Sequence, residues 1–165
     1  MVEKKILVDG LRFSYNGPFD IIEFFKTTEY WIKSNEMEKE IKRKLEHVNP
    51  TGKKIEWFIE AWKMHSNYAK GVVRMRALFN NIQEVEVVKN DKKRKLNFGD
   101  VLIIFDGFIE TDLEARWHQK PLFYFMRALA DKYVFKFWTG KYHNLIRKDV
   151  YSMHMALKEF FEAYK

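Results

Sequence analysis

The sequence predicts a single α+β domain in which a long antiparallel sheet packs on helices. Two patterns predict it: apolar residues alternate with a period of two through most of the first two thirds, and helical spacing appears near the start and at the end. A chain of 165 residues fits one domain, since a second independent core would be cramped. Only seven glycines and three prolines occur, and no repeat is visible, so we expect one domain over residues 1–165.

The composition limits the class of protein. Hydrophobic residues make up 47% and charged residues 32%, which excludes a chain disordered throughout. The absence of cysteine excludes a disulfide framework, thiolate metal sites and thiol catalysis. No apolar run reaches the length of a secretory signal or a membrane span, so we expect a cytoplasmic protein. The dominance of Lys and Glu among the charges suits a heat-adapted source and a thermostable fold.

The first elements are a strand and a helix. In residues 4–15 the side chains of Leu11, Phe13 and Tyr15 alternate with polar ones, which predicts a strand. Pro18 follows in a turn sequence and suits the first position of a helix. The helix is expected to run to about Lys33, with an apolar stripe of Ile21, Phe24, Phe25, Thr28, Trp31 and Ile32.

A series of neighbouring antiparallel strands is expected next. Turn residues, including Asn49-Pro50-Thr51-Gly52 and Asn80-Asn81, separate the apolar stretches, and the polar run 90–95 is expected to form a hairpin tip. This spacing predicts a meander. The five expected strands are residues 36–48, 55–64, 72–79, 82–89 and 101–111.

The last third is expected to be helical. One helix is predicted over residues 122–137 and is ended by Thr139-Gly140, and a long amphipathic helix is predicted over residues 146–164. The pattern does not decide whether residues 113–118 form a short strand. The expected order is therefore strand, helix, five strands and two helices, with about six or seven strands forming a curved antiparallel sheet on the long C-terminal helix.

This order of elements resembles the START-like helix-grip superfamily, also called SRPBCC. In that fold a curved sheet wraps a long C-terminal helix and leaves a cavity between them. The resemblance covers nearly the whole chain and rests on element order. The superfamily has no signature residues, so no functional residue is carried over. The helix expected over residues 122–137 departs from the superfamily, which has a last strand there. The resemblance implies a small hydrophobic ligand held between sheet and helix.

Seven residues are candidates for lining such a cavity. Arg43 and His47 share an apolar strand face with Ile41, where they could hold a carboxylate or phosphate of a ligand. The alternative is that they lie near the sheet edge and extend to water. The expected lining is Ile41, Arg43, His47, Trp57, Met75, Met153 and Leu157.

Catalytic and metal-binding signatures are missing from the sequence. It contains no glycine-rich phosphate loop, no H-E-x-x-H and no nucleophile elbow, and the five histidines do not cluster at ligand spacing, so no metal or cofactor is expected. Asp106 shares a strand face with Ile104 and Phe108, and as a partly buried carboxylate it could serve a cyclase- or hydrolase-type enzyme. We favour an ion pair instead, because no nucleophile accompanies it; the candidate partners are Arg43, Arg74 and Arg76.

The charge balance suggests a second function. The formal net charge is +7, which favours anionic partners such as RNA or phosphates, although a solvated lysine-rich surface would give the same number. Lys92, Lys93, Arg94 and Lys95 form a basic hairpin tip that could lie along a phosphate backbone, or could be only a soluble turn. The alternative to ligand binding is therefore an RNA- or ribosome-associated factor.

One strand is apolar on both faces. Residues 101–109 place Ile103 and Phe105 on one face and Ile104 and Phe108 on the other. A sheet covered on one side only would not need both, so the helix over residues 122–137 or another subunit is expected on the outer face. We expect a homodimer or a protein partner there, and a binding protein rather than an enzyme.

Overall fold

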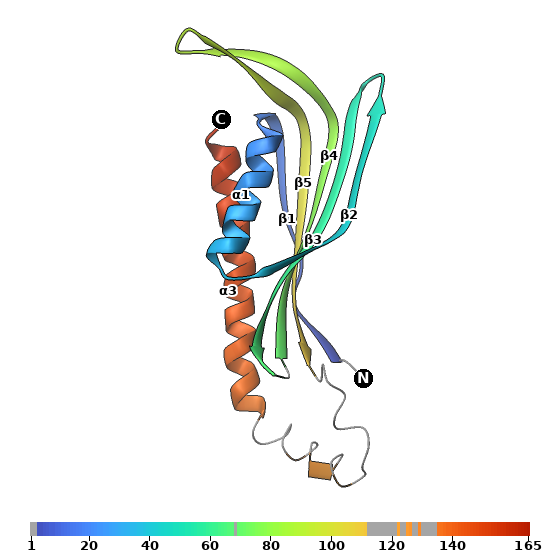
Figure 1. Ribbon diagram of the computed structural model, residues 1–165, viewed down its shortest axis with the longest axis vertical. Coiled ribbons are helices and arrows are strands. Elements are labelled where there is room, and N and C mark those ends of the chain that lie inside the picture. The colour runs from blue at the N-terminus through green and yellow to red at the C-terminus, as the bar shows by residue number, and fades with distance from the viewer. Residues whose placement is uncertain (1–2, 68, 112–121, 123–124, 127–128, 130–134) are drawn as a thin grey trace.

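The computed structural model describes residues 3–67, 69–111, 122, 125–126, 129 and 135–165 (Figure 1). These residues confirm the α+β class. The elements are β1 Glu3–Phe19, α1 Ile21–Ser34, β2 Glu38–Asn49, β3 Gly52–Ser66, β4 Ala69–Lys89, β5 Lys92–Thr111 and α3 Phe135–Glu162. The strands form one antiparallel sheet in the order β1-β5-β4-β3-β2, so the first and last strands are neighbours.

The described residues hold five strands, and the expectation of six or seven was wrong. The stretches 72–79 and 82–89 belong to the single strand β4. Asn81 has a φ of 55°, and the pairing of β4 with β5 shifts between Asn80 and Gln83. One left-handed residue makes a bulge that bends a strand without reversing it, so the Asn-Asn pair is not a turn. The strand left open over residues 113–118 lies outside the described residues.

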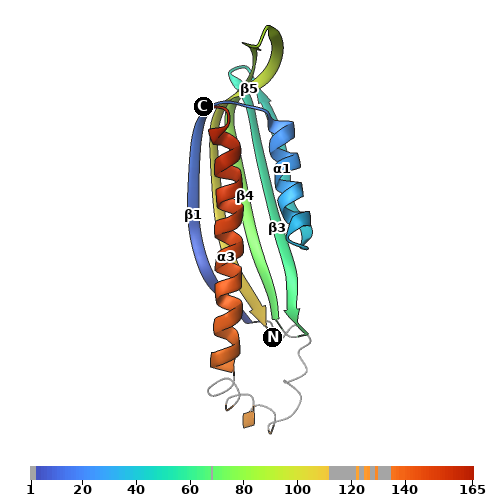
Figure 2. The same ribbon diagram turned by 90° about the vertical axis from the view of Figure 1, so that its left-hand side faces the viewer.

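Both described helices lie on the same side of the sheet, which we call the inner face (Figures 1 and 2). The opposite side is the outer face. Of the helix expected over residues 122–137, Leu122, Phe125, Met126 and Leu129 are helical and exposed, residues 135–137 belong to α3, and the others lie outside the described residues.

Two expected helix boundaries were wrong. The chain does not turn at Thr139-Gly140, because α3 continues through both residues. A glycine inside a helix costs only about 1 kcal/mol, which a helix packed along a sheet can absorb. At the other helix, α1 begins at Ile21 and not at Pro18, because the Asp20 side chain accepts hydrogen bonds from the backbone of Ile22 and Glu23 and caps the helix there.

The core lies between the inner face and the two helices. Phe161 of α3 is fully buried, and its ring contacts rings from β1 and α1. It thereby joins the end of the chain to its beginning. The ring centroids lie 4.8 Å away for Tyr15, 5.1 Å for Phe160, 5.5 Å for Phe13 and Phe19, and 5.7 Å for Phe24.

One hairpin extends beyond the rest of the sheet. The pairing of β3 with β4 ends at Ile82, and the pairing of β1 with β5 ends at Asn97. Residues 85–89 and 92–96 therefore pair only with each other, and Gln83 and Glu84 pair with Phe98 and Asn97. We call residues 83–96 the ribbon; in Figure 1 it projects past the other strands and curves toward the side of the helices. Among the described helices, none has both the length and the apolarity required to cross a membrane.

Candidate functional site

The end of the ribbon concentrates positive charge. Within residues 89–95, five of seven residues are Lys or Arg and one is Asp. All five basic side chains are exposed. Among the described residues, no acidic side chain forms an ion pair with any of the four lysines, which are Lys89, Lys92, Lys93 and Lys95.

The turn at the tip fixes which side chains face each other. Asn90 and Asp91 have φ values of 54° and 59°, as a two-residue type I′ turn requires. The register then pairs Lys89 with Lys92. Like charges directly opposite each other on a sheet are destabilising. The tip therefore holds a charge repulsion that a bound anion would relieve.

Arg94 has a different role from the lysines. Its guanidinium Nη2 lies 3.5 Å from Oδ2 of Asp20, the residue that caps α1. On the same face of the ribbon Leu96 is buried. Arg94 therefore contacts the body of the protein, whereas the lysines have no acidic partner among the described residues.

The neighbouring hairpin between β2 and β3 also has basic residues, and three of them have acidic partners. Lys53 lies 3.6 Å from Glu46, and Lys54 lies 3.4 Å from Glu56. Arg43 lies 3.5 Å from the second oxygen of Glu56. Glu46 and Glu56 thus partner three cations of this hairpin, and the ammonium of Lys44 lies 5.2 Å from the ring centre of Phe25. The four ribbon lysines, in contrast, have no acidic partner among the described residues.

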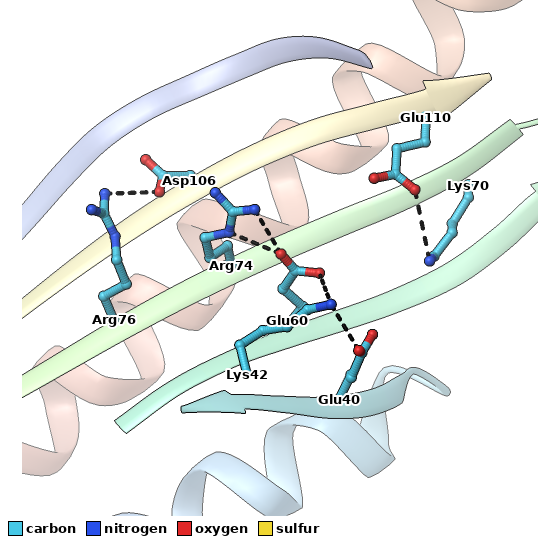
Figure 3. A network of polar contacts seen from close by, with 8 residues as sticks. All are labelled: Glu40, Lys42, Glu60, Lys70, Arg74, Arg76, Asp106 and Glu110. Atoms are coloured by element: carbon cyan, nitrogen blue, oxygen red, sulfur yellow. Dashed lines mark hydrogen bonds and ion pairs between the residues drawn. The ribbon is translucent and has the colours of Figure 1, made fainter. Parts of the chain in front are cut away.

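The outer face carries a network of ion pairs across β2 to β5 (Figure 3). At its centre Glu60, only 7% exposed, accepts two hydrogen bonds from Arg74, at 2.7 and 2.9 Å. Lys42 lies 3.4 Å from the other oxygen of Glu60 and 2.7 Å from Glu40. Burial opposes ionisation of Glu60, but the hydrogen bonds from Arg74 and the charge of Lys42 lower its pKa.

Asp106 belongs to this network and is buried, as its strand face predicted. Its Oδ2 lies 3.0 Å from Arg76, one of the three expected partners. Its Oδ1 accepts a hydrogen bond of 2.8 Å from the backbone N–H of Gly10, which has a φ of +66° beside a register shift in β1. Both oxygens are therefore occupied in holding the edge strand and Arg76, a structural arrangement.

Long basic side chains also cover aromatic rings on the outer face. Lys4 lies 3.7 Å from the ring centre of Phe108, and Arg74 lies 5.0 Å from the same ring. Lys70 lies 4.5 Å from the ring of Trp62 and pairs with Glu110 at 3.7 Å. Such cation–π contacts remove apolar surface from water. They explain how Phe108 is 1% exposed without a described helix over it.

The seven residues predicted to line a cavity are divided between two faces. Trp57, Met75, Met153 and Leu157 meet between the inner face and α3, each no more than 3% exposed. Ile41 pairs with Ile59 at the edge of that face and is 51% exposed. A register shift between Ile41 and Arg43 then turns Arg43 and the exposed His47 to the outer face.

A second polar cluster joins β3 to α3. The Nε2 atom of His65 is buried and has no hydrogen-bond partner among the described residues, and its ring stacks on Tyr142 at 5.2 Å. Lys63 lies 3.6 Å from Asp149. Burial and the charge of Lys63 lower the pKa of His65, against the opposing effect of Asp149. Burial raises the pKa of Asp149, which Lys63, His65 and Lys148 oppose.

No family model, curated protein or solved structure matches the chain significantly. Among the described residues, no group of three or more His, Asp or Glu side chains is arranged to hold a metal ion. The candidate site therefore rests on this molecule's own geometry.

Lys89 is the member of the ribbon cluster that the sequence pattern missed. It belongs to the preceding strand and precedes the expected polar tip. A two-residue turn at Asn90-Asp91 would have identified it, because that turn places Lys89 opposite Lys92.

Asp106→Asn is expected to lower the free energy of unfolding by about 1–3 kcal/mol, because an amide N–H₂ replaces an acceptor that Arg76 or Gly10 needs. Urea unfolding at neutral pH measures it. Asp9→Asn, at an exposed position of β1, should stay within about 0.5 kcal/mol of the natural protein. Equal stability of the two variants would show that the buried carboxylate is not structural.

His65 should make stability depend on pH. Because its folded pKa lies below 6.5, the unfolded chain binds the proton more readily, and this contribution to stability is lost as pH falls below about 6.5. The His65→Gln variant lacks this titrating group, so it should lose less free energy of unfolding than the natural protein between pH 7.5 and pH 5. Urea unfolding at both pH values tests it. His47→Gln, on an exposed residue, should respond to pH as the natural protein does; an equal response of His65→Gln would contradict the assignment.

Proposed function

We propose that this protein binds nucleic acids through their phosphate backbones, with the ribbon as its contact element. The observation that carries the proposal is the pair Lys89 and Lys92, which face each other across the turn. Lys93 and Lys95 lie beside them, and none of the four has an acidic partner among the described residues. Opposed cations cost stability unless an anion lies between them. A phosphate backbone, in RNA or DNA, supplies such anions in a row.

The distribution of ion pairs supports this location. On the outer face Lys42, Lys70, Arg74 and Arg76 all have acidic partners. On the hairpin of β2 and β3, Lys53 and Lys54 are also paired, as described above. The ribbon lysines form no ion pair with a described residue, so they can bind a phosphate without breaking one.

The side chains on the ribbon suit contact without base recognition. Lysine offers a mobile point charge that tolerates varied phosphate geometry, whereas a bidentate contact of fixed geometry suits the planar guanidinium of Arg. Arg94, the one guanidinium in the cluster, contacts Asp20. We therefore expect binding that depends weakly on sequence and strongly on salt.

Replacing Lys89, Lys92, Lys93 and Lys95 with Gln should abolish most of the binding. Four phosphate contacts predict a plot of log affinity against log salt with a slope of about −3, which corresponds to about 60-fold weaker binding between about 50 and 200 mM salt. The variant should bind weakly with a slope near zero. Fluorescence anisotropy with labelled RNA and DNA oligonucleotides measures both quantities.

A control variant removes the same charge elsewhere. The control carries four Lys→Gln substitutions outside the ribbon, at Lys5, Lys26, Lys53 and Lys54. It lowers the net charge by the same amount and leaves the ribbon unchanged. This control should keep the slope of the natural protein. If both variants lose affinity equally, binding reflects net charge alone and the proposal fails.

A competing proposal is that the fold is a helix-grip variant that holds a small hydrophobic ligand. Two observations favour it: the order of the described elements, and the meeting of Trp57, Met75, Met153 and Leu157 between the sheet and α3. We place it second because these side chains pack among the aromatic rings around Phe161. A ligand would have to displace buried side chains. A homodimer or partner contact on the outer face likewise stays a proposal, supported by the partly exposed Ile104.

Native mass spectrometry of the protein isolated from its own host distinguishes these proposals. We expect the mass of the polypeptide without a retained small molecule, because the interior is filled by side chains. A retained lipophilic mass would favour the ligand proposal instead. The spectrum also gives the number of subunits, and an outer-face dimer should dissociate in an Ile104→Lys variant.

A further inference from the structure

The lysines of the ribbon point to both of its faces. In an antiparallel pair, residues directly opposite each other share a face, and successive residues alternate. Lys89 and Lys92 share one face, and Lys93 lies on the other together with Lys95. A phosphate strand running along one face could neutralise only half of these charges. Neutralising both faces together requires phosphates on two sides of the ribbon.

A groove between two backbones meets this requirement. The major groove of B-form DNA is about 12 Å wide and admits a two-stranded ribbon, whereas that of A-form RNA is deep and narrow. The tip consists of two strands alone, because neither β1 nor β3 pairs with residues 83–96. The free part of the hairpin thus has the cross-section that such a groove accepts.

The ribbon lacks the side chains that single strands need. Proteins that bind single strands stack the bases on aromatic rings. Residues 83–96 contain no Phe, Tyr or Trp, and Phe98, 42% exposed, lies where β5 already pairs with β1. At the tip, Val88 is 63% exposed and faces the same side as Lys93. The side chain of Val88 could enter a groove, because it has no polar atom that would need a hydrogen-bond partner there.

The charges behind the tip limit how far it could enter. Glu86 lies opposite Lys95 on the same face. A carboxylate is repelled by phosphates, so Glu86 stays at or outside the groove rim and Lys95 contacts the outer edge of a backbone. On the other face Arg94 contacts Asp20, which fixes the ribbon against the body. Residues 88–93 are the part free to insert. The one carboxylate among them, Asp91, lies in the turn itself and would enter between the two backbones, over the base edges, where a carboxylate can accept from cytosine N4.

We propose that the tip of the ribbon inserts into the major groove of a B-form double helix. Lys89 and Lys92 contact one backbone, and Lys93 and Lys95 contact the other. This inference rests on the proposed function, of which it names the substrate class. The lysines contact phosphates and so recognise the shape and charge of the duplex, while Asn90 and Asp91 in the turn are the side chains nearest to the base edges.

The test compares four probes of one sequence: a 20-base-pair DNA duplex, the matching RNA duplex and the two single strands. We expect the DNA duplex to bind at least about tenfold more tightly than each of the others at equal salt, since among the four probes it alone has a major groove wide enough to admit a two-stranded ribbon. Equal or tighter binding of the RNA duplex or of a single strand overturns this inference and leaves the proposed function standing. Failure of all four probes to bind overturns both.

Two double variants test the two-sided contact. One variant combines Lys89→Gln with Lys92→Gln and removes the lysine charges from one face. The other combines Lys93→Gln with Lys95→Gln and removes them from the opposite face. On the DNA duplex each variant should reduce the salt slope by about 1.8, that is, about 0.9 per lost contact. If one variant loses nearly all of the slope and the other none, the ribbon lies with one face on the nucleic acid and the groove model is wrong. Unfolding midpoints in urea no lower than that of the natural protein confirm that both variants remain folded, and loss of the repulsion between Lys89 and Lys92 should raise the midpoint of the first variant.

Discussion

The need to keep one face of the sheet dry governs the structure. Phe161 meets rings from β1 and α1 at centroid distances below 6 Å, so the last turns of α3 pack on elements formed at the start of the chain. Aromatic contacts of this kind add to the burial of large apolar area. Once α3 and α1 occupy the inner face, the helices hold the N-cap of α1 in the position where Asp20 meets Arg94. The direction of the ribbon therefore depends on the core.

The outer face carries aromatic rings that no described helix covers. Its strands carry Trp62 and Phe108 among charged residues. Lys70 lies over Trp62 and pairs with Glu110, and Arg74 lies over Phe108 and pairs with Glu60. Lys4 also covers Phe108, and Arg76 pairs with Asp106. Most of these charged groups thus have a partner within the molecule. The balance of charge on this face contrasts with the ribbon, where four lysines have no acidic partner among the described residues.

This contrast is the physical basis of the proposed function. A paired cation must lose its partner before it binds a phosphate, whereas an unpaired one gives up only water and counterions. The opposed lysines at the turn add a repulsion within the protein that a bound phosphate removes. The two-stranded projection then determines which nucleic acid could offer phosphates on both of its sides.

The sequence by itself determined the α+β class, the helix with the stripe from Ile21 to Ile32, the burial of Asp106 and the basic tip, because each depends on local periodicity or local composition. Tertiary structure decided the rest. An Asn-Asn pair suits a turn and a bulge equally well, so the sequence cannot distinguish them. The pairing of β4 with β5 makes Asn80-Asn81 a bulge within β4. A single register shift beside Ile41 moved Arg43 and His47 to the opposite face, which alternation alone cannot reveal. The tertiary structure also decided which cations are free, since an ion pair joins residues far apart in the chain, as Arg76 and Asp106 are.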